Sequence, residues 1–355
     1  MKSTNLDIQF VKFIYSWAIV IYHLAASTAV AFKGGYCGVE YFLLTAGVFL
    51  FLSFEKGEAK GMQKTPGEYL KHRFSRFFPW SLTAYLLCVV VEYGILNPIT
   101  NLSGWMDLAA SGLWELLMIK GNGMNNDVHL LNGPAWTLSA MLIIGFFIWT
   151  FMYFYKKPFV NLIMPMTLVA GFGYWMHLPS ANTESWMGIT TFGTFRTWLI
   201  MCLSYYCLPM SRKLAAISFN KKGKWLLTAA EVVIHLFALT VMVFRETRYY
   251  QWVLTLMFMV SISIAMSGHS YLAKLLEGRK LIRLMGDLSM SIYLVHTPVI
   301  RLFRTYCDIS SWGMMDLIPV FAAIMLVAVL HDRITRGVMK YFPPLWRGFL
   351  EKITN

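Results

Sequence analysis

The chain has 355 residues, of which 57% are hydrophobic and only 14% are charged, and its formal net charge is +13. A soluble domain of this size cannot bury so much apolar surface, so the composition excludes a soluble globular protein and indicates a polytopic membrane protein. The positive charge fits loops that face anionic lipid, and no nucleic-acid partner is needed to explain it.

Ten apolar stretches follow one another along the chain, and we expect each of them to form a membrane-spanning helix. Most are close to the ~20 residues that cross ~30 Å of hydrocarbon as a helix. The predicted fold is therefore all-α, a single transmembrane domain over residues 1–355 built as a bundle of about ten helices. The stretches lie at 8–30, 38–54, 74–96, 133–155, 159–178, 190–209, 225–244, 251–273, 284–306 and 313–334.

The distribution of basic residues orients these stretches in the membrane. Most of the 31 lysines and arginines fall in alternate connecting segments, which the positive-inside rule assigns to the cytoplasm. We therefore expect both chain termini to be cytoplasmic. The first stretch lacks a small-residue cleavage site, so we expect it to remain in the mature protein.

The first stretch carries two ionisable residues, Lys12 and His23, in an otherwise apolar segment. They are eleven residues apart, close to three helical turns, so they project from one helix face roughly 16 Å apart. An ionisable group in hydrocarbon persists only when it is paired or hydrated, which makes both residues functional candidates. The imidazole of His23 can take a proton from a hydroxyl group. The structural alternative is a hydrogen bond that only packs helices together.

The next two stretches add an acid and an arginine pair. Glu40 stands near the outer start of the second stretch, where its carboxylate could orient the imidazole of His23 or simply be solvated. Arg73 and Arg76 are three residues apart at the inner end of the third stretch, so they share a helix face and could hold a phosphate. The positive-inside rule alone also accounts for this pair, and the local pattern favours that interpretation.

The outer segment 97–132 contains a predicted interfacial helix at 104–119, and His129 in this segment fits a solvated loop residue. Trp136 and Ser139 open the fourth stretch, at a depth where a tryptophan is most often part of the aromatic belt.

The ninth stretch carries a polar stripe, because Ser289, Tyr293 and His296 fall at i, i+4 and i+7 of a predicted helix. The depth of His296 is comparable to that of His23, which suggests a shared polar cavity. An interhelical hydrogen-bond set fits the pattern equally well. Arg196 in the sixth stretch could contact an anionic acceptor or lipid, but only weakly.

Metal and disulfide chemistry find little support in the sequence. The five cysteines are odd in number, lie mostly within or at the ends of the apolar stretches, and show no CxxC pattern. We therefore expect them to pack in the bundle, with no metal site and no disulfide framework.

Taken together and in this order, the segments resemble the acyltransferase-3 family of integral membrane acyltransferases. The resemblance covers nearly the whole chain and implies a multi-pass enzyme of a bacterial cell membrane. It also implies transfer of an acyl group, usually acetyl from acetyl-CoA, to a hydroxyl on a sugar or other extracytoplasmic acceptor. The segments that carry it are LDIQFVKFIYSWAIVIYH, GVEYFLLTAGVFL, RFSRFFPW, GPAWTLS and GDLSMSIYLVHTPV.

The resemblance assigns roles to single residues near the donor side. It implies that His23 is the catalytic histidine and that Lys12 occupies the preceding basic position, which is usually arginine. A lysine cannot reproduce the planar fork of an arginine. Arg73 and Arg76 match the RxxR motif at the cytoplasmic side, which is associated with the acyl donor.

The resemblance also places three further positions. Glu40 matches the acidic residue before the aromatic pair. Thr45 stands where serine is usual, and Met141 stands where a glutamate is common after the Trp–Ser segment.

We therefore expect a membrane O-acyltransferase that uses acetyl-CoA, needs no metal and modifies an extracytoplasmic glycan-type hydroxyl acceptor. The alternative is a transporter or flippase for a polar glycan or small organic acid. An arginine pair at the cytoplasmic mouth beside an intramembrane histidine suits a CoA ester better. The expected catalytic residues are His23 and Glu40, the donor-binding residues are Lys12, Arg73 and Arg76, and the supporting residues are Trp136, Ser139, Tyr293 and His296.

Overall fold

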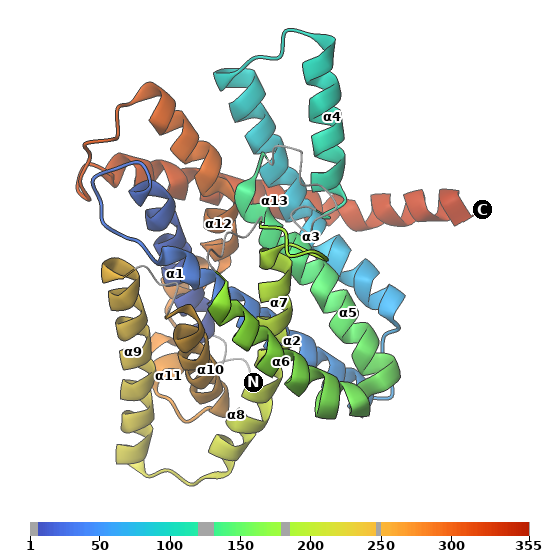
Figure 1. Ribbon diagram of the computed structural model, residues 1–355, viewed down its shortest axis with the longest axis vertical. Helices are drawn as coiled ribbons and strands as arrows, with labels where there is room; N and C mark the ends of the chain where they lie inside the picture. The colour runs from blue at the N-terminus through green and yellow to red at the C-terminus, as the bar shows by residue number, and fades with distance from the viewer. Residues whose placement is uncertain (1–5, 120–130, 179–184, 246–249, 355) are drawn as a thin grey trace.

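A computed structural model describes residues 6–119, 131–178, 185–245 and 250–354, and these form a helical bundle (Figure 1). Within the described ranges the only bridge between extended segments is an isolated one, Trp186 with Thr191. The α-helices are α1 Leu6–Ala25, α2 Gly38–Ala59, α3 Pro66–Val89, α4 Leu102–Leu116, α5 Trp136–Pro158, α6 Met164–His177, α7 Phe192–Leu203, α8 Cys207–Ala216, α9 Lys221–Phe244, α10 Gln251–Ser267, α11 Leu272–Leu276, α12 Lys280–Tyr306 and α13 Ile318–Thr354. Short 3-10 or π turns are η1 Gly35–Cys37, η2 Val90–Leu96, η3 Gly133–Ala135, η4 Phe159–Ile163 and η5 Ser204–Tyr206.

The predicted all-α fold is confirmed, and each of the ten predicted stretches contains helix. Six helical runs in the described part of the chain are long and apolar enough to cross a membrane. The shorter helix α10 is also apolar. The six runs are Leu6–Ala25, Gly35–Ala59, Pro66–Leu96, Gly133–His177, Lys221–Phe244 and Ile318–Tyr341.

Several helix boundaries differ from the predicted ones for local reasons. α3 begins at Pro66, before the predicted stretch 74–96, because Thr65 and Glu68 form a capping box. The Glu68 side chain accepts a hydrogen bond from the Thr65 backbone N–H at 2.8 Å, and the Thr65 hydroxyl accepts one from the Glu68 backbone N–H at 3.3 Å. A capping box begins a helix whatever its hydropathy, so polar first turns are missed by a hydropathy pattern. α5 and α6 form one run, kinked at Tyr155.

α1 packs against both α12 and α2 (Figure 1). The Ser16 hydroxyl of α1 donates to the Ser289 backbone carbonyl of α12 at 2.9 Å. Gly47 of α2 lets that helix approach η5 closely, since a Cβ at this position would lie 2.9 Å from the Met201 carbonyl oxygen and closer still to the Ser204 hydroxyl. Small residues at helix contacts are typical of membrane bundles.

The outer segment forms a helix, α4, as predicted, and it lies beside the end of α3 (Figure 1). Its exposed side chains include the large apolar residues Leu102, Trp105 and Met106. The Glu115 carboxylate ties this helix back to the bundle by accepting the backbone N–H groups of residues 131 and 132, at 2.8 and 3.3 Å. Its placement at the membrane interface stays a prediction, and His129 lies outside the described residues.

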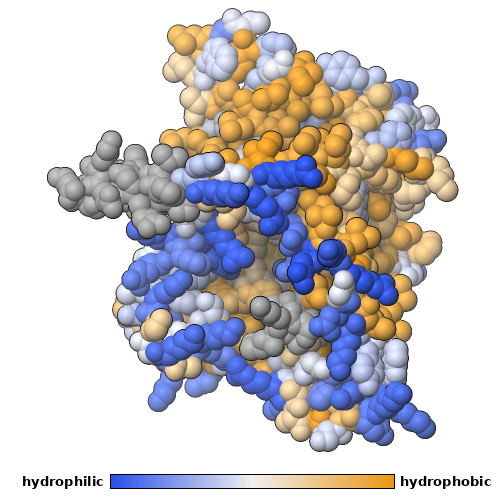
Figure 2. Space-filling view, turned by 180° about the vertical axis from the view of Figure 1, so that it is seen from behind, coloured by the Kyte–Doolittle hydropathy of each residue, from blue (hydrophilic) through white to orange (hydrophobic). Residues whose placement is uncertain are grey.

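The surface is divided into apolar and hydrophilic regions. Figure 2 shows the face behind that of Figure 1, where apolar side chains dominate the upper part and hydrophilic ones gather in the lower part around a hollow. A large apolar outer surface fits a protein whose solvent is lipid over part of its height.

Candidate active site

Two histidines lie side by side where α1 packs against α12. The ring centroids of His23 and His296 are 5.0 Å apart, with an angle of 35° between the ring planes. His296 is fully buried, whereas His23 is partly exposed. The structure therefore brings His23 and His296 together, as their comparable depth in the predicted helices suggested.

The backbone around His23 is fixed by a basic side chain from the same neighbouring helix. His23 lies in the last turn of α1, and the Arg304 guanidinium of α12 donates to its backbone carbonyl at 2.8 Å. A cation near the last carbonyls of a helix also interacts favourably with the helix dipole. The position of the His23 ring is further confined by Tyr22, whose ring centroid is 5.2 Å away.

The contacts of His296 define its tautomer. Its Nδ1 lies 3.3 Å from the backbone carbonyl oxygen of Ile292. A carbonyl oxygen only accepts hydrogen bonds, so Nδ1 carries the proton and Nε2 carries a lone pair in the neutral ring. Nε2 is buried, and no described residue forms a hydrogen bond with it. This nitrogen is thus an unused acceptor beside His23.

Tyr293 is anchored by hydrogen bonds rather than free to transfer a proton. Its hydroxyl donates to the Pro134 carbonyl oxygen at 3.0 Å and accepts from the Thr137 hydroxyl at 3.2 Å. Its ring centroid lies 6.1 Å from that of His296 and 5.8 Å from that of Phe42. Tyr293 therefore fixes the start of α5 beside the histidine pair.

Glu40 is paired with an arginine rather than with His23. The Arg196 Nε of α7 lies 3.0 Å from Glu40 Oε1, and both side chains are almost completely buried. The Gln251 amide of α10 donates to the same carboxylate oxygen. In the described part of the chain no hydrogen bond joins Glu40 to His23, because the first turn of α2 places this carboxylate toward α7 and α10.

Arg196 and Gln251 are the site residues whose role the sequence did not reveal. The Arg196 guanidinium lies 5.7 Å from the ring centroid of Trp136, so it connects α2 with the start of α5. An arginine inside an apolar stretch needs a counter-ion, so the position of Arg196 in the sixth stretch could have indicated a buried acidic partner. Ser139 is buried one turn after Trp136, and Met141 packs in the main apolar core.

Three cations gather near the other end of α1. The Lys12 ammonium lies close enough to the guanidinium groups of Arg73 and Arg76 on α3 for the like charges to repel one another. The structure thus brings together the residues predicted to bind the donor. Arg73 is held in place by Tyr69, whose hydroxyl accepts from its Nε at 3.3 Å, and by the Phe77 ring at 5.1 Å. No described carboxylate forms an ion pair with any of the three cations. The cluster is suited to bind an anion.

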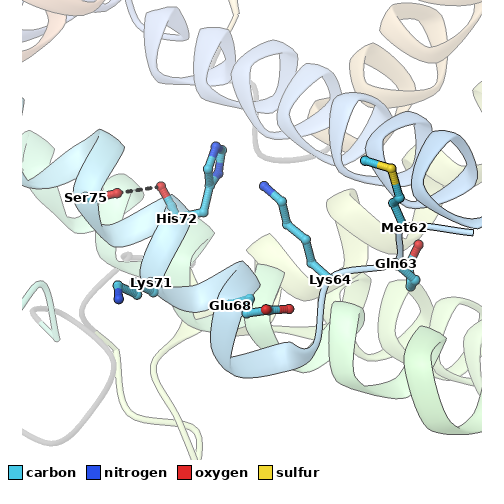
Figure 3. A pocket seen from close by; sticks show the side chains of 7 residues that line it. All are labelled: Met62, Gln63, Lys64, Glu68, Lys71, His72 and Ser75. Atoms are coloured by element: carbon cyan, nitrogen blue, oxygen red, sulfur yellow. Dashed lines mark hydrogen bonds between the residues drawn. The ribbon is translucent and has the colours of Figure 1, made fainter. Parts of the chain in front are cut away.

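A cleft of about 550 Å³ lies beside this cationic cluster, between the loop after α2 and the first turns of α3 (Figure 3). The His72 imidazole in the cleft lies within electrostatic reach of the Lys64, Arg73 and Arg76 charges. The cleft and the cationic cluster are therefore next to each other. Its lining residues are Met62, Gln63, Lys64, Glu68, Lys71, His72 and Ser75. Within the described ranges, no group of three or more His, Cys, Asp or Glu residues is arranged to hold a metal ion.

Comparison of the sequence with known proteins identifies the family of the chain. The chain is 26% identical over 366 residues to "Peptidoglycan O-acetyltransferase OatA" of Listeria monocytogenes serovar 1/2a. The alignment covers 94% of this chain and 56% of the relative, so the chain spans little more than half of that protein. No solved structure shows a significant match. A family model described as an acyltransferase domain matches residues 5–332, and the chain therefore belongs to the acyltransferase-3 family.

Proposed function

We propose that this protein is a membrane O-acyltransferase that takes an acetyl or other short acyl group from acyl-CoA at the cytoplasmic face. The acceptor is a hydroxyl group of an extracytoplasmic glycan. One observation carries the proposal. The same helix, α1, presents a cation at Lys12 that interacts with Arg73 and Arg76, and presents His23 beside His296 about three turns further along. The proposed donor site and the proposed proton acceptor thus lie about three turns apart along α1.

The proposed topology has ten spans with both termini in the cytoplasm. The run Gly133–His177 has 45 residues, about twice the ~20 needed for one crossing, so its two halves supply two spans. The remaining three spans are α7 continued through η5 into α8, α10, and α12. This arrangement agrees with the alternation of basic loops, and it puts Arg73 and Arg76 at the cytoplasmic end of α3.

In the proposed reaction, the hydroxyl oxygen of the acceptor attacks the thioester carbonyl carbon. A new C–O bond forms, the C–S bond breaks, and coenzyme A leaves. His23 accepts the hydroxyl proton during the attack and returns it to the departing thiolate, so protons and electrons balance. His296, with Nε2 unoccupied beside His23, supports the imidazole and the proton transfer.

The cations support binding of the donor, and Glu40 supports the scaffold. Lys12, Arg73 and Arg76 suit the pyrophosphate of a CoA ester, since charge-assisted contacts to phosphate are among the stronger hydrogen bonds. Glu40 acts through Arg196, whose guanidinium lies against the Trp136 ring at the start of α5. The glycan acceptor is proposed because the Listeria relative is named for peptidoglycan O-acetylation.

Acetyl transfer by the purified, reconstituted protein tests the proposal. Radiolabelled acetyl-CoA is supplied on the cytoplasmic side and soluble peptidoglycan fragments on the other. We expect transfer that falls about 10²–10⁴-fold in His23→Ala, as for loss of a general base. The matched control is His177→Ala, which removes a histidine at the exposed last turn of α6. Transport of the glycan without acyl transfer would instead identify a transporter.

Binding of the donor is tested separately. Coenzyme A at 100 times its Kd stabilises a native protein by about 2.7 kcal/mol, which appears as a rise in Tm. We expect this rise in the wild type and in His23→Ala, and its loss in Arg73→Ala combined with Arg76→Ala. No rise in the wild type at millimolar coenzyme A would contradict a CoA donor.

A further inference from the structure

Two arginines, Arg301 and Arg304, lie near the end of α12, beside the last turn of α1 that carries His23. Arg301 is paired with an acid, since its Nη1 lies 3.0 Å from Glu92 Oε2. The other oxygen of Glu92 accepts from the Asn97 amide at 2.8 Å. The charge of Arg301 is therefore balanced locally, and both oxygens of this acid are already in use.

Arg304 keeps its charge beside His23. Its Nη2 donates to the His23 backbone carbonyl at 2.8 Å, and its guanidinium lies within electrostatic reach of the imidazole. A carbonyl is neutral, so this contact holds the arginine in place without balancing its charge. In the described part of the chain no carboxylate forms an ion pair with Arg304. The side chain is exposed, and a guanidinium has further N–H donors for a ligand.

Two tyrosines extend the surface around His23. The ring centroid of Tyr22 lies 5.2 Å from that of His23 and 5.3 Å from that of Tyr36. All three side chains are partly exposed. Ligand sites combine aromatic surface with a few placed polar groups, and a tyrosine ring has both an apolar body and a polar tip. The end of α1 thus presents aromatic rings, an imidazole and an unbalanced cation together.

We propose that the acceptor is a sugar with an anionic group, which Arg304 binds while the reacting hydroxyl faces His23. This inference rests on the proposed acyl transfer and names the class of its acceptor. A carboxylate is the simplest group that fits, because its two oxygens match the planar fork of a guanidinium. Tyr22 and Tyr36 contact the sugar ring. The unbalanced charge also attracts anionic acceptors and repels cationic ones. Arg304 is thus a specificity residue and takes no part in proton transfer.

The test compares two sugars that have the same hydroxyl groups but differ in charge. Tetragalacturonate and its methyl ester are titrated into the full chain in neutral detergent at low ionic strength, and binding is followed by tryptophan fluorescence. We expect the wild type to bind the acid about tenfold more tightly than the ester, as a charge-assisted contact implies. In Arg304→Gln this ratio falls toward one, because only the acid loses a contact. A general disturbance of His23 would weaken both sugars and leave the ratio unchanged.

The neighbouring ion pair supplies the matched control. Arg301→Gln combined with Glu92→Gln removes an arginine one turn from Arg304 without changing the net charge, and we expect it to keep the wild-type ratio. The inference is overturned if the wild type binds the two sugars equally or binds neither. It is also overturned if Arg304→Gln keeps the ratio while losing stabilisation by phosphatidylglycerol, which would identify a lipid headgroup site. The proposed function fails in a different way, when acetyl-CoA donates no acetyl group to any glycan although the preference for the acid remains.

Discussion

The buried ion pair between Glu40 and Arg196 gives the most demanding prediction about stability. Arg196→Met keeps a long apolar side chain but leaves the Glu40 carboxylate buried without its counter-charge at 3.0 Å. Removing one partner of a buried pair costs about 3–5 kcal/mol. Loss of the contact with the Trp136 ring at 5.7 Å adds about 0.5–2 kcal/mol. We expect Arg196→Met to lower the free energy of unfolding by at least about 3 kcal/mol.

A double-mutant cycle separates this pair from simple packing. Glu40→Gln keeps the shape of the side chain and its contact with Gln251, and combined with Arg196→Met it leaves no uncompensated charge. We expect the double variant to be more stable than Arg196→Met alone. Reversible unfolding in mixed micelles with rising dodecyl sulfate, followed by tryptophan fluorescence, gives the free energies. Losses that add within about 0.5 kcal/mol would show that the two side chains are not coupled and would refute the reasoning.

Three further predictions concern positions away from this pair. Gly47→Ala places a Cβ against Ser204, so we expect a loss of about 1–3 kcal/mol in the same unfolding assay, whereas Gly173→Ala, which has open space, serves as a control with little change. Tyr293→Phe removes the hydroxyl that joins α12 to the start of α5, and a loss of about 1 kcal/mol is expected; an unchanged stability would mean that this bond contributes nothing. Thr65→Ala removes the cap of α3 and should cost about 0.5–2 kcal/mol, with faster hydrogen exchange in the first turn of α3 as the specific readout; protection equal to wild type would contradict it.

The helices could be predicted because hydropathy is a local property. Every predicted apolar stretch contains helix, and the boundaries that differ reflect features that hydropathy does not register. The capping box at Thr65 extended α3 toward its start. The stretch predicted at 251–273 was shortened because Gly268 adopts a φ of 75°, a left-handed conformation that ends α10 at Ser267.

The site could be predicted only in part because its contacts join distant segments. His23 and His296 were placed together from their depth alone, and the cationic cluster from the spacing of Arg73 and Arg76 with the position of Lys12. The partner of Glu40 was not predicted, since Gln251 follows it by 211 residues and depth does not distinguish one neighbouring helix from another. The catalytic roles of these residues stay predictions for the assays above.

The unbroken course of α1 has a consequence for how this segment can vary. Lys12 and His23 lie on the same face of one helix, in which each residue turns the chain by about 100° and advances it by about 1.5 Å. Inserting or deleting one residue between them would swing His23 out of contact with His296, although hydropathy would be unchanged. Substitutions between the two positions are therefore tolerated more readily than changes of length. Among natural members of the family we expect this interval to keep a constant number of residues, while the outer segment 97–132 varies in length with the acceptor.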